Sequence, residues 1–91
     1  MIDVVPKTEE QSLAEAIAAK VLEIKSEAER RITALDWRLQ RAREREQLGE
    51  TGVETVADVL ALREQIRQQS NAAEAVVAML TATHEVQAFT W

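Results

Sequence analysis

The feature that most constrains the fold is an apolar repeat that runs through the first half of the chain without interruption. Apolar side chains recur there every three or four residues, the spacing that places them along one side of an α-helix. From Ile17 to Leu39 the repeat makes six steps over 22 residues, a mean of 3.67 residues per step. This mean is closer to an eleven-residue repeat than to a heptad, so any supercoil should be weak or slightly right-handed. The repeat consists of Leu13, Ile17, Val21, Ile24, Ala28, Ile32, Leu35, Leu39 and Ala42.

The boundaries of this helix follow from the residues on either side of the repeat. Thr8 is a plausible N-cap, and Gln11 stands three residues later, as in a capping box. No glycine or proline occurs between Pro6 and Gly49, so we predict one helix over residues 8–48. Such a helix is roughly 60 Å long at 1.5 Å per residue. The rest of a 91-residue chain cannot cover a rod of that length as a ball, so a hairpin or a multi-chain bundle is expected.

Residues 48–52, Leu-Gly-Glu-Thr-Gly, form the only clear turn in the sequence. Gly49 can adopt the left-handed conformation that ends a helix, and Thr51 with Glu54 offers a capping box for the next one. A loop this short makes the two helices antiparallel neighbours. We predict the second helix over residues 52–82. The sequence leaves open whether it continues through Asn71, kinks near residues 70–71 or gives way to a third helix.

The predicted fold is therefore all-α, a long antiparallel helical hairpin over residues 8–83. Residues 1–7 read as an extended arm, either frayed or lying along a neighbouring subunit, and residues 84–91 as a short C-terminal aromatic tail. Only 3% of the residues are aromatic, so the core is thin and we expect the chain to form a coiled-coil-like oligomer. The predicted helix-packing stripe is Ile17, Val21, Ile24, Ile32, Leu35, Leu39, Val59, Leu62, Ile66, Val77 and Leu80.

The composition argues against catalysis, metal binding and membrane insertion. The chain has no cysteine and one histidine, His84, so a metal site would need carboxylates alone around that histidine. No serine stands in an activating arrangement, and no glycine-rich phosphate loop occurs. No apolar run approaches the length of a bilayer span, and the N-terminus does not read as a secretory signal. We predict a non-enzymatic protein without catalytic residues, cofactor, metal or small-molecule substrate.

The charge is distributed unevenly and singles out one stretch for interaction. The formal net charge is −5, yet residues 29–46 carry six arginines against four acids. This arginine band has three interpretations: a salt-bridged helix face, a contact with an acidic protein, or a nucleic-acid contact, which the interleaved acids disfavour.

Three aromatic residues complete the set of interaction candidates. Trp37 lies off the apolar line, so it either packs against the second helix or anchors a partner. Phe89 and Trp91 should tuck under the hairpin or into a neighbouring subunit. The candidate interaction residues are Trp37, Arg38, Arg41, Arg45, Phe89 and Trp91.

One stretch of the chain also carries a family resemblance. The segment ITALDWRLQRA at residues 32–42, followed by LREQIR at residues 62–67 and by Trp91, resembles small helical proteins encoded among the tail and tail-fibre genes of tailed bacteriophages. These include tail-assembly chaperones and minor tail components, and the resemblance covers roughly residues 28–91. It implies a protein of the virion, or of the host cytoplasm during assembly, that binds other tail proteins through helical surfaces.

Three functions stay open at this point. The first is a structural or assembly component of a phage tail or tail fibre, acting as a homo-oligomer. The second is a transient assembly chaperone that is absent from the mature particle. The third is a small nucleic-acid-binding regulator that uses Arg38, Arg41 and Arg45.

Overall fold

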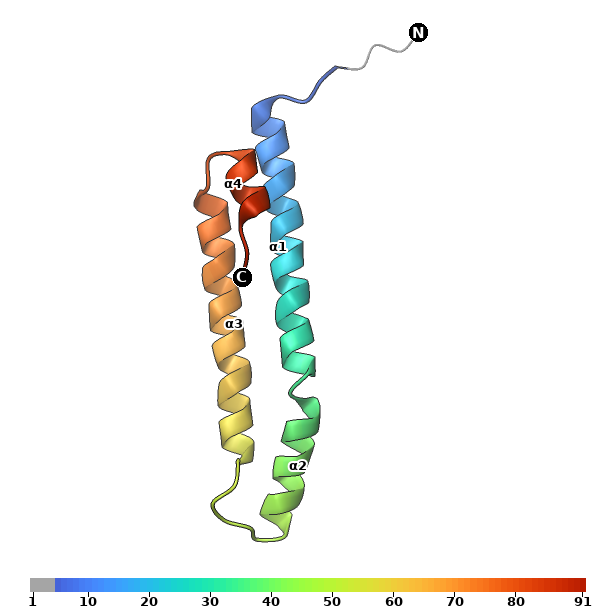
Figure 1. The fold of residues 1–91 in the computed structure, drawn as a ribbon, viewed down its shortest axis with the longest axis vertical. Coiled ribbons are helices and arrows are strands. Elements are labelled where there is room, and N and C mark those ends of the chain that lie inside the picture. The colour runs from blue at the N-terminus through green and yellow to red at the C-terminus, as the bar shows by residue number, and fades with distance from the viewer. Residues whose placement is uncertain (1–4) are drawn as a thin grey trace.

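The computed structural model describes residues 5–91 and contains four helices in that range (Figure 1). They are α1 (Glu9–Thr33), α2 (Asp36–Gln47), α3 (Val56–Met79) and α4 (Thr83–Ala88). α1 and α2 together form a bent rod, α3 runs antiparallel beside it, and the short α4 folds back between α1 and α3. The predicted all-α hairpin is thus confirmed. Most of the predicted N-terminal arm, residues 1–4, lies outside the described residues.

The hairpin is long and thin. Its Cα atoms span 72 × 28 × 14 Å, with a radius of gyration of 19.9 Å. A compact domain of the same length would have a radius of gyration of about 12 Å. The molecule is therefore essentially one layer of helices, and its broad faces carry most of its surface.

The start of α1 and the end of α2 follow the local sequence signals. The amide of Gln11 donates to Thr8 Oγ1 over 3.1 Å, and the amide of Thr8 donates to Gln11 Oε1 over 3.0 Å. This reciprocal pair is the predicted capping box, which is confirmed. After α2, Gly49 has φ of 71°, the left-handed conformation expected of a residue that follows a helix.

The predicted capping box at Thr51 and Glu54 is wrong. α3 begins four residues later, where Thr55 Oγ1 accepts from the amide of Asp58 over 3.1 Å and Asp58 Oδ2 accepts from the amide of Thr55 over 3.0 Å. Two causes explain the shift. Gly52 has φ of 74°, which is not helical, and the Glu54 carboxylate is paired with Arg38 across the loop.

The long helix predicted over residues 8–48 is present but bent, and it is not continuous, because a turn at Ala34 and Leu35 divides it into α1 and α2. The amide of Leu35 donates to the carbonyl of Ile32 over 3.0 Å, a three-residue spacing that tightens the turn. Two β-branched residues, Ile32 and Thr33, weaken the helix just before the turn. Asp36 then occupies the first turn of α2, where the helix dipole favours an acid.

The open question about Asn71 has a clear answer, since α3 continues through it from Val56 to Met79. The end of that helix comes earlier than the predicted residue 82. Leu80 has ψ of 142°, an extended conformation that turns the chain back toward α1. α4 then begins at Thr83, whose hydroxyl donates to Glu9 Oε1 over 2.8 Å. The predicted aromatic tail at residues 84–91 therefore includes all of α4 except Thr83, and Thr83 ties this helix to the start of α1.

Two small clusters of buried side chains hold the hairpin together. The first joins α1, α3 and α4 and contains Ile24, Ala73, Val77 and Val86. The second joins α2 to α3 and contains Leu35, Leu39, Ala42 and Val59. Every residue of the predicted packing stripe is buried or half-buried. Val86, which is fully buried, was not part of that stripe, because its burial depends on the fold-back of α4.

The two threonines before α3 give a direct test of its start. Replacing Thr55 by Ala removes the N-cap side chain and should lower the free energy of unfolding by about 1 kcal/mol. Thr51→Ala is the matched control and should leave it nearly unchanged, since α3 does not start there. Thermal or urea unfolding followed by circular dichroism measures both. An equal loss of stability in the two variants would contradict the assignment.

Candidate interaction site

Trp37 lies on the outer edge of the hairpin, away from α3. Its side chain is 61% exposed, whereas Leu39, two residues later, is buried against α3. Two residues correspond to about 200° around a helix, so the two side chains point to opposite sides of α2. Of the two interpretations of Trp37, packing against the second helix is therefore wrong.

Arg41 accompanies Trp37 on that edge. Its guanidinium carbon lies 5.8 Å from the centroid of the Trp37 ring, within reach of a cation–π interaction. The two residues are one helical turn apart, the separation at which helix side chains become neighbours. Together they present a flat aromatic surface with a positive charge beside it, and we refer to them as the Trp37–Arg41 edge.

The other predicted arginines of α2 are engaged within the chain. Arg38 pairs with Glu54, and Arg45 Nε lies 3.7 Å from Glu50 Oε2. The Arg38 guanidinium, through its hydrogen bonds, holds the pKa of the Glu54 carboxyl below its ordinary value. Both pairs tie α2 to the loop before α3. Among the candidates Arg38, Arg41 and Arg45, only Arg41 therefore stands beside the exposed tryptophan.

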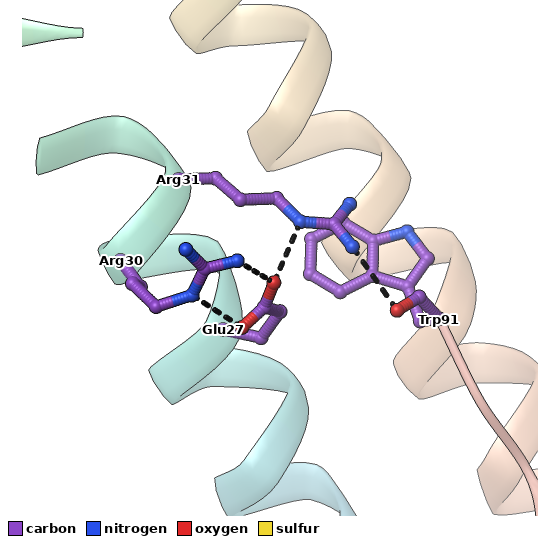
Figure 2. A network of polar contacts seen from close by, with 4 residues as sticks. All are labelled: Glu27, Arg30, Arg31 and Trp91. Atoms are coloured by element: carbon purple, nitrogen blue, oxygen red, sulfur yellow. Dashed lines mark hydrogen bonds and ion pairs between the residues drawn. The ribbon is translucent and has the colours of Figure 1, made fainter. Parts of the chain in front are cut away.

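The arginines at the end of α1 form a second polar network, shown in Figure 2. Glu27 accepts from Arg30 Nε over 2.8 Å and from Arg31 Nε over 2.9 Å. These hydrogen bonds, that of Arg30 foremost, lower the pKa of Glu27 to about 2. Arg31 also stacks on the Trp91 ring, with its guanidinium carbon 4.1 Å from the ring centroid, and donates to the Trp91 carbonyl over 3.1 Å.

The C-terminal aromatic residues pack within the chain. Phe89 and Trp91 are half-buried against the cluster around Ile24 and Val77. Lys20 Nζ adds hydrogen bonds to the carbonyls of Gln87 and Phe89, over 3.3 and 3.1 Å. The segment thus covers one face of the α1–α3 seam, and the structure does not bring Phe89 or Trp91 close to the Trp37–Arg41 edge.

Several other large apolar side chains are exposed along the hairpin. Leu22 on α1 and Leu48 after α2 point away from α3, as Trp37 does, because each lies about half a turn from the buried residues of its helix. Val76 and Met79 are exposed on α3.

Two further kinds of arrangement were sought in the described part of the chain, a cluster of metal ligands and a membrane-spanning helix. Within residues 5–91, no three histidine, aspartate or glutamate side chains converge on one point. In the same range, none of the helices combines the length and the apolar character of a transmembrane span.

Comparison with known proteins gave no match for this chain among protein-family models, curated proteins or solved structures. The resemblance of residues 28–91 to bacteriophage tail proteins therefore stays a prediction.

The network at Glu27 predicts a pH dependence of stability. Because the pKa of Glu27 is about 2 in the folded chain and 4.5 ordinarily, its contribution is present above pH 4.5 and is lost as the pH falls toward 2. The midpoint of thermal unfolding should fall over that window, and Glu27→Gln should flatten the profile. Glu23→Gln, on the same helix, is the matched control. Parallel profiles for Glu27→Gln and the wild type would contradict this role.

The two tryptophans should differ in their access to solvent. Trp37 is 61% exposed, whereas Trp91 is half-buried beneath Arg31. Acrylamide should therefore quench the fluorescence of Trp91→Phe, which retains Trp37, more strongly than that of Trp37→Phe. Stern–Volmer constants measure the difference. Equal constants would show that the C-terminal segment does not rest on α1.

Proposed function

We propose that this chain is a non-enzymatic protein–protein interaction module and acts as a structural or assembly component of a bacteriophage tail or tail fibre. The observation that carries the interaction role is the Trp37–Arg41 edge. No aromatic ring is among the buried residues of the hairpin core, and yet the Trp37 ring is left exposed rather than buried there. Trp37 therefore does not serve to pack α2 against α3. The phage setting rests on the resemblance of residues 28–91.

The chemistry of the edge defines the partner. Tryptophan and arginine are the residue types most often responsible for binding energy at protein interfaces. An apolar pocket would receive the Trp37 ring, and an acidic side chain at its rim would pair with Arg41. The partner surface is therefore expected to be apolar at its centre and acidic at its edge.

The shape of the molecule supports the same role. A hairpin only 14 Å thick between its outermost Cα atoms has little room for an internal binding cavity, but it presents long faces to other proteins. The ion pairs of Arg30, Arg31, Arg38 and Arg45 leave fewer arginines for phosphate groups, so a nucleic-acid regulator is the weaker alternative.

Affinity purification from host cells that produce the complete phage tests this proposal. Tagged wild-type chain should co-purify with tail proteins at a fixed ratio, and Trp37→Ala should weaken that association by tenfold or more, roughly the cost of losing a hot-spot residue. Leu22→Ala, which removes another exposed apolar side chain from the same edge, is the control.

The location of the chain then separates the two phage roles. A structural component is present in purified mature particles, whereas an assembly chaperone is found with its client in the lysate and is absent from the particles. Failure of the wild-type chain to associate with any tail protein would overturn the proposed function.

A further inference from the structure

A groove between α1 and α3 lies on the face of the hairpin opposite to α4. On α1, the side toward the C-terminal segment carries Lys20, Glu27 and Arg31. Lys25 and Ile32 lie roughly 100–160° around the helix from these residues, on the other side of the buried line through Ile24 and Ala28. The groove has a volume of about 440 Å³. It is lined by Lys25, Ala28, Glu29, Ile32, Arg67, Ser70, Asn71 and Glu74.

The charges around this groove alternate. On the α1 rim, Lys25 is followed one turn later by Glu29; on the α3 rim, Arg67 precedes Glu74 by two turns. Because the helices are antiparallel, Lys25 faces Glu74 at one end of the groove, with Nζ 3.7 Å from Oε1. Glu29 and Arg67 lie at the other end. Each rim therefore carries one positive and one negative charge, in opposite order along the long axis.

Glu74 is left short of a hydrogen-bond donor. Its Oε1 atom is buried and has no hydrogen-bond partner among the described residues, since Lys25 Nζ at 3.7 Å is beyond hydrogen-bond distance. A buried carboxylate oxygen without a donor is costly. Within residues 5–91, the one ion pair of Arg67 is with Glu64, also at 3.7 Å, and the Arg67 side chain is 55% exposed. Glu74 thus brings a weakly paired carboxylate to the groove, with 22% of its side chain exposed, and Arg67 brings a guanidinium that can pair with a neighbouring molecule.

A two-fold rotation brings these groups together. The midpoint between Lys25 and Glu29 is residue 27, and the midpoint between Arg67 and Glu74 falls between residues 70 and 71. Because Lys25 stands opposite Glu74 on antiparallel helices, these two midpoints lie at nearly the same height on the hairpin. Consider a two-fold axis that runs at this height, perpendicular to the helices and parallel to the broad face. It places Lys25 opposite the Glu29 of a second copy. The same axis places Arg67 opposite the second copy's Glu74.

We propose that this groove is a self-association surface, on which a second copy of the chain docks face to face and antiparallel. Each interface then contains two Lys25–Glu29 pairs and two Arg67–Glu74 pairs, as an isologous contact requires. Ala28 and Ile32 form its apolar floor, and Ser70 and Asn71 lie near the axis. The proposal rests on the interaction role proposed above and adds the identity of one partner.

The overall charge distribution selects the antiparallel arrangement. Residues 5–28 and 69–91, at the α4 end, carry seven acids and three lysines, a charge of −4. Residues 29–68 carry eight arginines and eight acids and are neutral. A parallel stack would place the two −4 halves on each other, whereas the antiparallel stack places each on a neutral half. Like-charge repulsion therefore disfavours the parallel alternative.

The face is also large enough. A stable interface buries about 800 Å² on each partner. The Cα atoms extend over 72 × 28 Å in the plane of this face, the segment before α1 included, and 800 Å² is less than half of that rectangle. Leu60, which is 46% exposed on the same side of α3, would extend the apolar contact beyond the groove.

Charge reversal with mixing tests the arrangement. Sedimentation velocity on the full chain should show a wild-type dimer that dissociates on dilution. Arg67→Glu places Glu opposite Glu74, and Glu74→Arg places Arg opposite Arg67, so each variant alone should dimerise at least about tenfold more weakly. An equimolar mixture of the two variants should form a heterodimer with nearly wild-type affinity, since both of its pairs are again of opposite charge. Glu44→Arg, an exposed reversal on α2 outside the groove, is the control and should dimerise like the wild type.

Other outcomes overturn the proposal. A wild-type chain that stays monomeric at millimolar concentration would remove it and leave the groove to a different partner. Mixing that fails to restore the dimer would show that the copies do not meet in this register, because a parallel stack pairs Arg67 with Glu29 and gains nothing from mixing. Circular dichroism of each variant checks that it folds. None of these results bears on the Trp37–Arg41 edge, which is tested by association with tail proteins.

Discussion

Two helices packed side by side have a single seam in which to bury apolar side chains, and the rest of this structure depends on that constraint. Apart from Ser70, the buried seam here consists of aliphatic residues, with Val59 and Val77 fully buried and alanines at Ala28, Ala42 and Ala73. Small residues let the helices approach closely but remove little apolar surface from water. The fold-back of α4 adds Val86 at one end of the seam, and Phe89 and Trp91 pack beside it. The other face of the seam remains open to solvent and to other molecules.

Much of the fold could be predicted from the sequence because it is encoded by local patterns. The capping box at Thr8, the left-handed Gly49 and the burial of the apolar stripe all depend on residues a few positions apart. The start of α3 could not be fixed in this way. Both Thr51 and Thr55 precede an acid by three residues, and the choice between them depends on the contact of Glu54 with Arg38, sixteen residues away. The bend at Ala34 and Leu35 occurs without glycine or proline, the residues by which a break is usually recognised.

Among the candidate site residues too, features set by local position could be predicted and those set by distant contacts could not. Trp37 was singled out because it departs from the apolar line, and its exposure follows from that local position. The ion pairs of Arg38 and Arg45 could not be predicted from local position, since their partners, Glu54 and Glu50, lie in the loop between α2 and α3. The groove on the face opposite α4 was missed altogether. Its charges come from two helices, and only the register that sets Lys25 against Glu74 brings them together.

The position of Trp91 has a practical consequence for labelling. The chain ends between α1 and α3, well short of either end of the rod (Figure 1). A fluorescent protein or other fusion joined after Trp91 would project from the α4 face, at a point between the two ends of the rod. It would leave the Lys25–Glu74 groove clear, and in electron micrographs it would mark which face of each rod points outward.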